Sequence, residues 1–363
     1  MSGAEPIPAG LERVLSLPRE AGSAEAAEAR ELLRNSLVAL GYDVETLRFA
    51  FSPGTLNAFP LAGAGLGWLA ILQIPLLLMP ALPAWGALLV WIVGLGGILA
   101  LSVGTALGWG ARSDVREDAT LIARRSPAPV RRWIVAHTDT KAQGHSMAGR
   151  LVAIWAVLAA VAALTLLAAL RLGGALHPAP VATAALGTLL AGFLAGRGKL
   201  RGRTTGARDN GSGLVAALAA AEASTDPATG ILLTGAEEFG LVGARILAQT
   251  RPELIRGTDV VNLDTLDDRG TLSLVSHDAQ GRKLAGRLAP LLASPGAAVR
   301  ERRLPVGIFV DSYPLARAGG RAVTIGRLDW ATLRLIHTPR DSRDTLSFAT
   351  ALRIGRVLGS TTA

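Results

Sequence analysis

Apolar residues are concentrated in two blocks of the 363-residue chain. The first block, residues 49–111, contains no Asp, Glu, Lys or Arg, and the second begins at Leu151. Within the blocks lie four apolar stretches, near 59–79, 84–108, 151–170 and 179–196. Each is close to the roughly 20 residues that a helix needs to cross a bilayer. The pattern therefore predicts two transmembrane hairpins with four helices in all.

Burial inside a large soluble core is the alternative for these stretches. A core helix usually keeps a polar stripe, and the uncharged first block argues against that alternative. The soluble alternative is stronger for 179–196, where Gly192 and Gly196 have the small-xxx-small spacing of a helix-packing face. None of the four stretches contains a charged residue, so the sequence indicates no path for ions or protons through them.

Basic residues are gathered at one end of both hairpins. The turn at 80–83 is uncharged, and the turn at 171–180 carries only Arg171 and His177. The opposite ends are flanked by Arg112, Arg116, Arg124, Arg125, Arg131, Arg132, Arg197, Lys199, Arg201, Arg203 and Arg208. Loops rich in Lys and Arg stay in the cytoplasm. We therefore expect an integral protein of a bacterial inner membrane, with its polar segments on the cytoplasmic side.

The polar segments alternate between strand and helix patterns. An amphipathic helix is expected at 24–40, between Ser23 as N-cap and Gly41 as stop. Strand-like runs follow at 43–50, 119–124, 131–136, 229–234, 258–263, 271–276 and 322–326, and helical runs near 212–223, 240–250, 278–293 and 346–359. This alternation predicts a three-layer αβα domain. The hairpins interrupt it, which gives the segments 1–56, 57–111, 112–148, 149–197 and 198–363.

Composition narrows the chemistry. Apolar residues make up 50% of the chain and charged residues 18%, which excludes a disordered protein. Cysteine is absent, which excludes disulfides, thiolate zinc sites and cysteine nucleophiles. Aromatic residues make up only 4%, and the basic runs adjoin apolar stretches, so we expect no nucleic-acid partner.

Imidazole and carboxylate side chains follow the expected strands or begin the segments after them. The candidates are His137, Asp139, Asp209, Glu237, Glu238, Asp264 and His337. Each has a simpler explanation when taken alone: Asp209 as a helix N-cap, for example, or the paired glutamates as a solvated surface. Taken together they could converge, because open α/β sheets form their sites at the carboxyl ends of strands. Imidazole nitrogen and carboxylate oxygen are ligands that zinc accepts.

Five short motifs occur in a fixed order along the chain. They are HTD at 137–139, ARDNGSG at 207–213, GAEEFG at 235–240, VNLD at 261–264 and HTPRD at 337–341. Together they resemble the co-catalytic dizinc aminopeptidases of metallopeptidase family twenty-eight, relatives of leucyl aminopeptidase and glutamate carboxypeptidase II. The resemblance covers residues 24–51 and 119–359 without the second hairpin. It implies a mixed central sheet between helix layers.

The resemblance implies two Zn²⁺ ions and a ligand set for them. Asp209 would bridge the two ions. His137 and Asp264 would complete the ligands of one ion, and Glu238 and His337 those of the other. Five ligands, one of them shared, give three per ion and leave room for a water that bridges both.

The resemblance also implies the catalytic residues. Glu237 would be the general base that takes a proton as the bridging hydroxide attacks the scissile carbonyl. Asp139 would orient the ring of His137. The peptide bond between Asp209 and Asn210 would be cis.

The substrate-binding region departs from the family pattern. The family has Ser-Asp-His before an aromatic residue, whereas this chain has Val310-Asp311-Ser312-Tyr313, so Asp311 and Tyr313 are pocket candidates. We expect a membrane-anchored aminopeptidase that acts on peptides. A carboxypeptidase or a glutaminyl-cyclase-like enzyme of the same fold, and an inactive membrane adaptor, are the alternatives. The complete ligand set favours an enzyme, and the sequence does not indicate an oligomeric state.

Overall fold

The computed structural model describes residues 6–8, 10–106, 114–125, 129–293, 299–304 and 307–362. The chain forms two compact units, each built from separate stretches of sequence. The α/β unit comprises Met1–Phe51, Arg116–Ala142 and Gly202–Ala363. The helical unit comprises Ser52–Val115 and Gln143–Arg201. The chain therefore leaves the α/β unit twice and returns to it twice.

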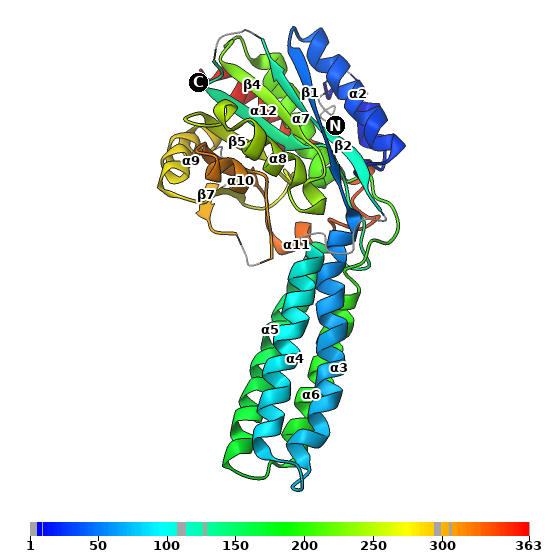
Figure 1. Cartoon of the computed structure of the whole chain (residues 1–363). Coiled ribbons are helices and arrows are strands. Elements are labelled where there is room, and N and C mark those ends of the chain that lie inside the picture. Colours follow the sequence, from blue (N-terminus) through cyan, green and yellow to red (C-terminus); the bar gives the residue numbers. More distant parts are fainter. Residues whose placement is uncertain are drawn as a thin grey trace. The chain divides into compact units, whose positions relative to one another are not determined.

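A mixed sheet of eight described strands forms the centre of the α/β unit (Figure 1). Its spatial order is β1 (Asp43–Phe51), β2 (Arg116–Arg124), β4 (Thr229–Thr234), β3 (Arg132–His137), β5 (Asp259–Leu263), β8 (Arg321–Gly326), β6 (Leu272–Ser276) and β7 (Val299–Arg302). The pairs β4–β3, β3–β5 and β5–β8 are parallel. The pairs β1–β2, β2–β4 and β8–β6 are antiparallel. Four parallel strands thus occupy the middle of the sheet.

Helices cover both faces of the sheet because strand side chains alternate between two apolar layers. On β3, Ile134 and Ala136 belong to one layer, and Trp133 and Val135 belong to the other. The first layer contains residues of α1 (Leu11–Ser16), α2 (Ala24–Ala39), α7 (Ser212–Ala223), α9 (Ala279–Leu292) and α12 (Ala349–Ser360). The second contains residues of α8 (Val242–Thr250) and α10 (Ser312–Arg317). The predicted three-layer fold with a mixed sheet is confirmed.

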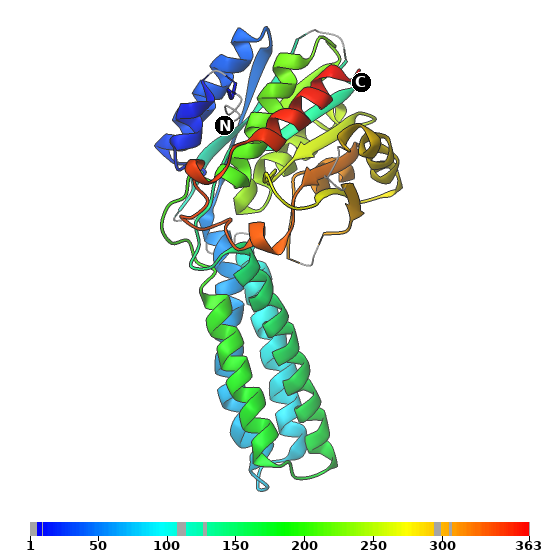
Figure 2. The same ribbon diagram turned by 180° about the vertical axis from the view of Figure 1, so that it is seen from behind.

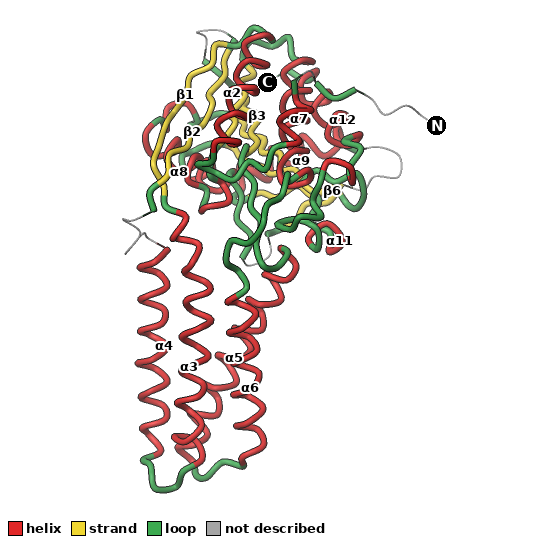
Figure 3. The backbone as a smooth tube through the Cα atoms, turned by 90° about the vertical axis from the view of Figure 1, so that its right-hand side faces the viewer, coloured by secondary structure: helices red, strands yellow, loops and turns green. Residues whose placement is uncertain are grey.

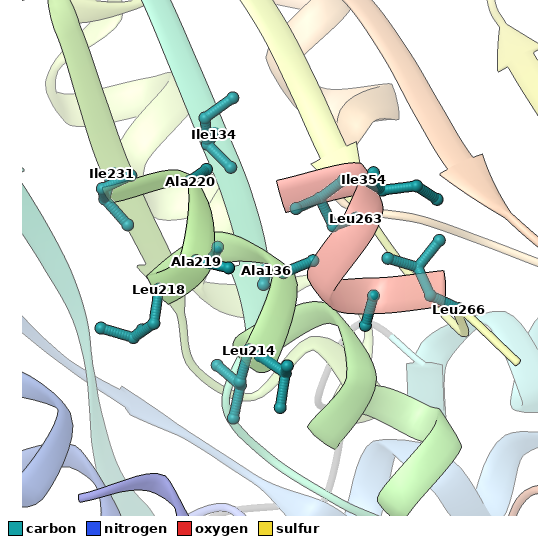
Figure 4. Close-up of a cluster of buried hydrophobic side chains, with 14 of the residues drawn as sticks. Ile134, Ala136, Leu214, Leu218, Ala219, Ala220, Ile231, Leu263, Leu266 and Ile354 are labelled. Carbon is teal, nitrogen blue, oxygen red and sulfur yellow. The ribbon is translucent and has the colours of Figure 1, made fainter. Parts of the chain in front are cut away.

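Helix α7 occupies the centre of the first layer and follows directly after Asp209. Its Leu214 and Leu218 point into the cluster that also contains Ile134 of β3 and Ile354 of α12 (Figure 4). Figure 2 shows α12, coloured red, beside α7. The two helices approach closely at Gly355, where a Cβ would lie 2.3 Å from the carbonyl oxygen of Ala216. This tight packing fixes the start of α7, and with it the Asp209 loop.

The described elements differ little from the predicted ranges. Helix α2 has its N-cap at Ser23, whose side chain accepts a hydrogen bond from the backbone N–H of Ala26, and Gly41 has a φ of 82°. The sequence pattern did not predict α1, β7, α10 and α11 (Trp330–Leu333). These are four to six residues long, and the burial of β7 is incomplete. Such short segments carry too few apolar positions to show a period.

Four helices make up the helical unit and lie side by side (Figure 3). They are α3 (Ala58–Leu78), α4 (Ala84–Ala106), α5 (Met147–Leu170) and α6 (Pro178–Gly196). All four are long and apolar enough to cross a membrane. Arg112, one of the basic residues expected beside the first hairpin, lies outside the described residues.

Close backbone contact and a few polar contacts hold the four helices together. A Cβ on Gly192 of α6 would lie 2.5 Å from the carbonyl oxygen of Gly63 on α3. Trp91 of α4 donates a hydrogen bond to Thr165 of α5 over 2.8 Å. Gly192 therefore lies in a packing face, as its spacing predicts. Gly196 has no atom within 4 Å of a built Cβ, so the predicted second position of that face makes no such contact.

Substitution of Gly192 by valine is predicted to destabilise the helical unit, because the new Cβ would meet the backbone of α3. We expect a loss of about 1–3 kcal/mol, which is typical of overpacking. Gly196→Val is the matched control on the same helix, because its Cβ would meet no atom within 4 Å. Unfolding of the purified chain in detergent, followed by circular dichroism, measures the difference. Equal stability of the two variants would contradict this packing.

Candidate metal centre

Three neighbouring strands end at the same edge of the sheet, and a candidate ligand follows each. Strand β3 ends at His137, β4 ends shortly before Glu238, and β5 ends directly before Asp264. Because β3 pairs in parallel with both β4 and β5, these carboxyl ends lie side by side. The topology thus brings together side chains that are far apart in the sequence.

One group of candidate ligands consists of His137, Asp209 and Asp264. Nε2 of His137 lies 3.1 Å from Oδ1 of Asp209 and 3.9 Å from Oδ1 of Asp264. The side chains of His137 and Asp209 are buried, and that of Asp264 is 14% exposed. One potential ligand atom from each residue lies within 4.8 Å of the others.

A second group consists of Asp209, Glu238 and His337. Nε2 of His337 lies 3.2 Å from Oδ2 of Asp209 and 3.1 Å from Oε1 of Glu238. Asp209 therefore faces the first group with Oδ1 and the second with Oδ2. A carboxylate in this position can serve two ions at once.

The two groups fit zinc in chemistry and in spacing. Ligand atoms about 2.0–2.2 Å from a tetrahedral zinc ion lie about 3.3–3.6 Å from one another, close to most of the distances above. Oε1 of Glu238 and Nε2 of His337 are buried and lie 3.1 Å apart, but among the described residues neither atom makes a hydrogen bond of acceptable geometry. Buried polar atoms without partners cost free energy, which a cation between them would offset.

The pKa values of the two adjacent glutamates are shifted in opposite directions. Burial raises the pKa of Glu237 well above its ordinary value, and the negative charge of Glu238 raises it further. Burial would also raise the pKa of Glu238, but the positive charges of His337 and Lys141 lower it to about 2. Glu237 is therefore suited to exchanging a proton and Glu238 to staying ionised as a ligand.

Burial also raises the pKa of Asp264 to about 6, and the neighbouring charge of Asp209 contributes. In the second group the pKa of His337 is raised although burial lowers it, because Glu238 is close. Carboxylates outnumber positive charges in this centre. A bound cation would lower the cost of keeping them ionised.

Asp139, predicted to orient the ring of His137, also contacts the two adjacent glutamates. Nδ1 of His137 lies 3.1 Å from the backbone oxygen of Asp139 and 3.5 Å from its carboxylate. The carboxylate accepts hydrogen bonds from the backbone N–H groups of Glu237 and Glu238, over 3.0 and 3.1 Å. Asp139 thus connects the loop after β3 to the loop after β4.

The loop that carries Asp209 is held by Asn210. The Asp209–Asn210 peptide bond is cis, as the resemblance implies. The side chain of Asn210 donates to the carbonyl of Leu263, over 2.8 Å, and accepts from the N–H of Gly213, over 3.0 Å. A Cβ at Gly213 would lie 2.3 Å from Oδ1 of Asn210, so this position requires glycine. Asn210 thereby ties the Asp209 loop to the end of β5.

Asp341 and Arg208 support the same loop. The sequence assigned no role to Asp341 and counted Arg208 only among the basic residues that flank the apolar helices. The carboxylate of Asp341 accepts from the backbone N–H groups of Arg208 and Asp209, over 2.8 and 3.1 Å. The guanidinium of Arg208 donates to Asp267 over 2.8 Å. Both Asp341 and Arg208 belong to the five ordered motifs, so their place in HTPRD and ARDNGSG was the available signal.

Arg19 and Lys141 were also missed. Arg19 is completely buried and donates to backbone oxygens of two loops, those of Thr138 and Thr205, over 2.9 and 2.8 Å. Lys141 is buried, and its Nζ lies 2.7 Å from Oε2 of Glu238. Arg19 stands in a segment without a motif, and Lys141 follows the HTD motif as a single lysine, so no pattern marked either residue.

The two candidates for the substrate pocket differ in exposure. Asp311 is buried, its carboxylate accepts from the hydroxyl of Thr234, and burial raises its pKa to about 7. Tyr313 is 48% exposed, and its ring makes a T-shaped contact with that of His277, with centroids 5.4 Å apart. Asp311 therefore lies at the end of β4, at the sheet edge where the candidate ligands gather, whereas Tyr313 is exposed to solvent.

Residues 190–362 match the model of Peptidase family M28. This range contains Asp209, Glu237, Glu238, Asp264 and His337. The matched range is a little under half of the chain, and the match supports the M28 family. His137, the first candidate ligand along the chain, stands before the matched range and joins it through the sheet.

Several solved structures share the fold of this chain. The aminopeptidase from Aneurinibacillus sp. strain AM-1 has a TM-score of 0.56 at 15% identity, over 97% of this chain and 91% of that one. BSAP, a zinc aminopeptidase from Bacillus subtilis, has a TM-score of 0.55 at 14% identity, over 97% and 93%. The glutaminyl cyclase of Fimbriiglobus ruber has a TM-score of 0.55 at 16% identity, over 96% and 92%. No curated protein matches the chain.

The family and these neighbours support a zinc metallopeptidase hydrolase. Aminopeptidases and a glutaminyl cyclase have nearly equal TM-scores, so the fold does not choose between them. That choice depends on the residues of the centre.

Proposed function

We propose that the chain is a membrane-anchored aminopeptidase that uses two zinc ions. The observation that carries the proposal is the position of Asp209, whose two oxygens face His137 and His337 at 3.1 and 3.2 Å. A single-ion site would need only one of these groups. Two complete groups therefore favour peptide hydrolysis with two ions over a chemistry that needs one.

Glu237 is the proposed general base. Bound zinc ions would lower the pKa of water and polarise the scissile carbonyl. The carboxylate of Glu237 takes the proton of the attacking water and later gives it to the nitrogen of the leaving group. Its backbone is fixed by the hydrogen bond to Asp139. Its pKa is raised above that of an ordinary glutamate, which favours uptake of the proton from water.

Replacement of Glu237 by glutamine is predicted to lower kcat by about 10²-fold or more, because the variant cannot accept the proton. A panel of aminoacyl amides, with the full chain in detergent and zinc present, measures this effect. The zinc content should stay at the parent level, because Glu237 is not one of the proposed ligands. Glu253→Gln removes an exposed glutamate of the same unit and serves as the matched control.

The outcome distinguishes the proposed enzymes. Release of amino acids by the parent and its loss in Glu237→Gln support an aminopeptidase. Cyclisation of a glutaminyl peptide without amino-acid release would favour the cyclase alternative instead. Bound zinc without either activity would contradict the aminopeptidase assignment.

We also propose that the helical unit crosses a bacterial inner membrane and that the α/β unit lies in the cytoplasm. Arg197, Lys199, Arg201 and Arg203 follow α6 directly, and basic residues at helix ends favour the cytoplasmic side. Arg125 and Arg132 contribute less to this argument than the sequence suggested. Their guanidinium groups donate to backbone oxygens inside the α/β unit, at Ala221 and Thr361.

Because the chain has no cysteine, single cysteines can report its sidedness. Ala175→Cys lies in the exposed turn after α5, and Gln280→Cys lies on the exposed side of α9. A maleimide that cannot cross membranes should label Ala175→Cys in intact spheroplasts and Gln280→Cys only after lysis. The reverse pattern would invert the orientation, and recovery of the chain in the soluble fraction would contradict the anchor.

A further inference from the structure

One of the expected ligands is in direct contact with a lysine. Lys141 is buried, with its side chain 2% exposed, and its Nζ lies 2.7 Å from Oε2 of Glu238. The same Nζ donates to the backbone oxygen of Glu238 over 3.2 Å. The ammonium group therefore holds both the main chain and the side chain of Glu238. Only Oε1 of that carboxylate faces His337.

The first ligand group has a different neighbourhood. Oδ1 of Asp264 accepts a hydrogen bond from the hydroxyl of Thr265, over 2.9 Å, which is a neutral donor. Each group contains one histidine and two carboxylates, one of which is shared. The second group alone has an ammonium ion paired with a ligand among the ion pairs of the described residues. When Lys141 is counted with the second group, that group carries one negative charge fewer than the first group.

This difference affects the binding of a divalent cation. An ammonium ion a few ångströms from a dication repels it, and buried charges are screened weakly. The contact with Lys141 also occupies Oε2, so Glu238 can offer one oxygen and not two. Both effects oppose an ion at the second group more strongly than one at the first, because Lys141 is in direct contact with Glu238.

We propose that Lys141 makes the two metal groups unequal, so that the group containing Asp264 fills first and the group containing His337 holds its ion more weakly. Lys141 is a positioning residue, because it acts through Glu238. The inference rests on the proposed use of two ions. It predicts that the active form of the enzyme depends on the concentration of free zinc.

Titration of Zn²⁺ into the chelator-stripped full chain in detergent tests the proposal, with a competing chelator to set the free concentration. The parent should bind two ions with affinities that differ by about tenfold or more. Lys141→Gln removes the charge but keeps an N–H donor, and should tighten the second ion by about tenfold or more. The affinity of the first ion should change less than that of the second. Lys141→Arg keeps the charge and should resemble the parent.

Two further variants make the result specific. Lys283→Gln removes an exposed lysine of α9, with the same change in net charge, and should leave both affinities at the parent values. Thermal unfolding in the presence of chelator shows whether the Lys141→Gln variant folds. If it does not, Lys141→Met, which also removes the charge, replaces it in the titration. A general loss of structure would weaken binding, so a tightened second ion cannot arise from damage.

Two outcomes would overturn the proposal. A second ion bound equally or more weakly in a folded Lys141→Gln variant would mean that Lys141 does not oppose that ion. This result would leave the two-ion function intact. Binding of a single ion by the parent and by Lys141→Gln alike would overturn the two-ion function itself, and the inference with it.

Discussion

Crowding of carboxylates at one edge of the sheet is the constraint on which the rest of the centre depends. The loops after the parallel strands β3, β4 and β5, together with the segments before α7 and α10, bring buried or nearly buried acidic groups together, namely those of Asp139, Asp209, Glu237, Glu238, Asp264 and Asp311. Like charges in a dry environment repel strongly unless cations or N–H donors face them. Backbone donors, two histidines and a lysine provide part of this compensation. The proposed zinc ions would supply the remainder.

The loops around the centre are arranged to hold these carboxylates in place. The carboxylate of Asp139 accepts hydrogen bonds from the backbone N–H groups of Glu237 and Glu238, and that of Asp341 accepts them from the Asp209 loop. Asn210 connects this loop to the end of β5. Hydrogen bonds between side chains and the backbone of neighbouring loops therefore hold the candidate ligands in position. Residues around metal sites commonly orient the ligands in this way. The first hairpin is inserted between β1 and β2, and the second between the loop after β3 and the Asp209 loop, so the sheet keeps its order although the chain leaves it twice.

The sequence predicted the features that a local pattern carries. Alternation and apolar runs predicted most strands, spacing and end residues predicted α2, and the order of five motifs predicted which residues meet. It missed what depends on contacts between distant segments. Arg19 binds carbonyls more than a hundred positions away, and Lys141 acquires a role only because β3 and β4 are neighbours. Gly192 and Gly196 look alike in sequence, but only the first meets another helix.

The zinc content of an Asp209→Asn variant is the most direct test of the two-ion centre, because Asp209 is the residue that both groups share. The full chain in detergent, saturated with zinc and freed of excess, can be analysed by mass spectrometry of the metal. We expect about two zinc ions in the parent, about one in Asp264→Asn and almost none in Asp209→Asn. A folded Asp209→Asn variant that retains the parent's zinc content would contradict a centre bridged by Asp209.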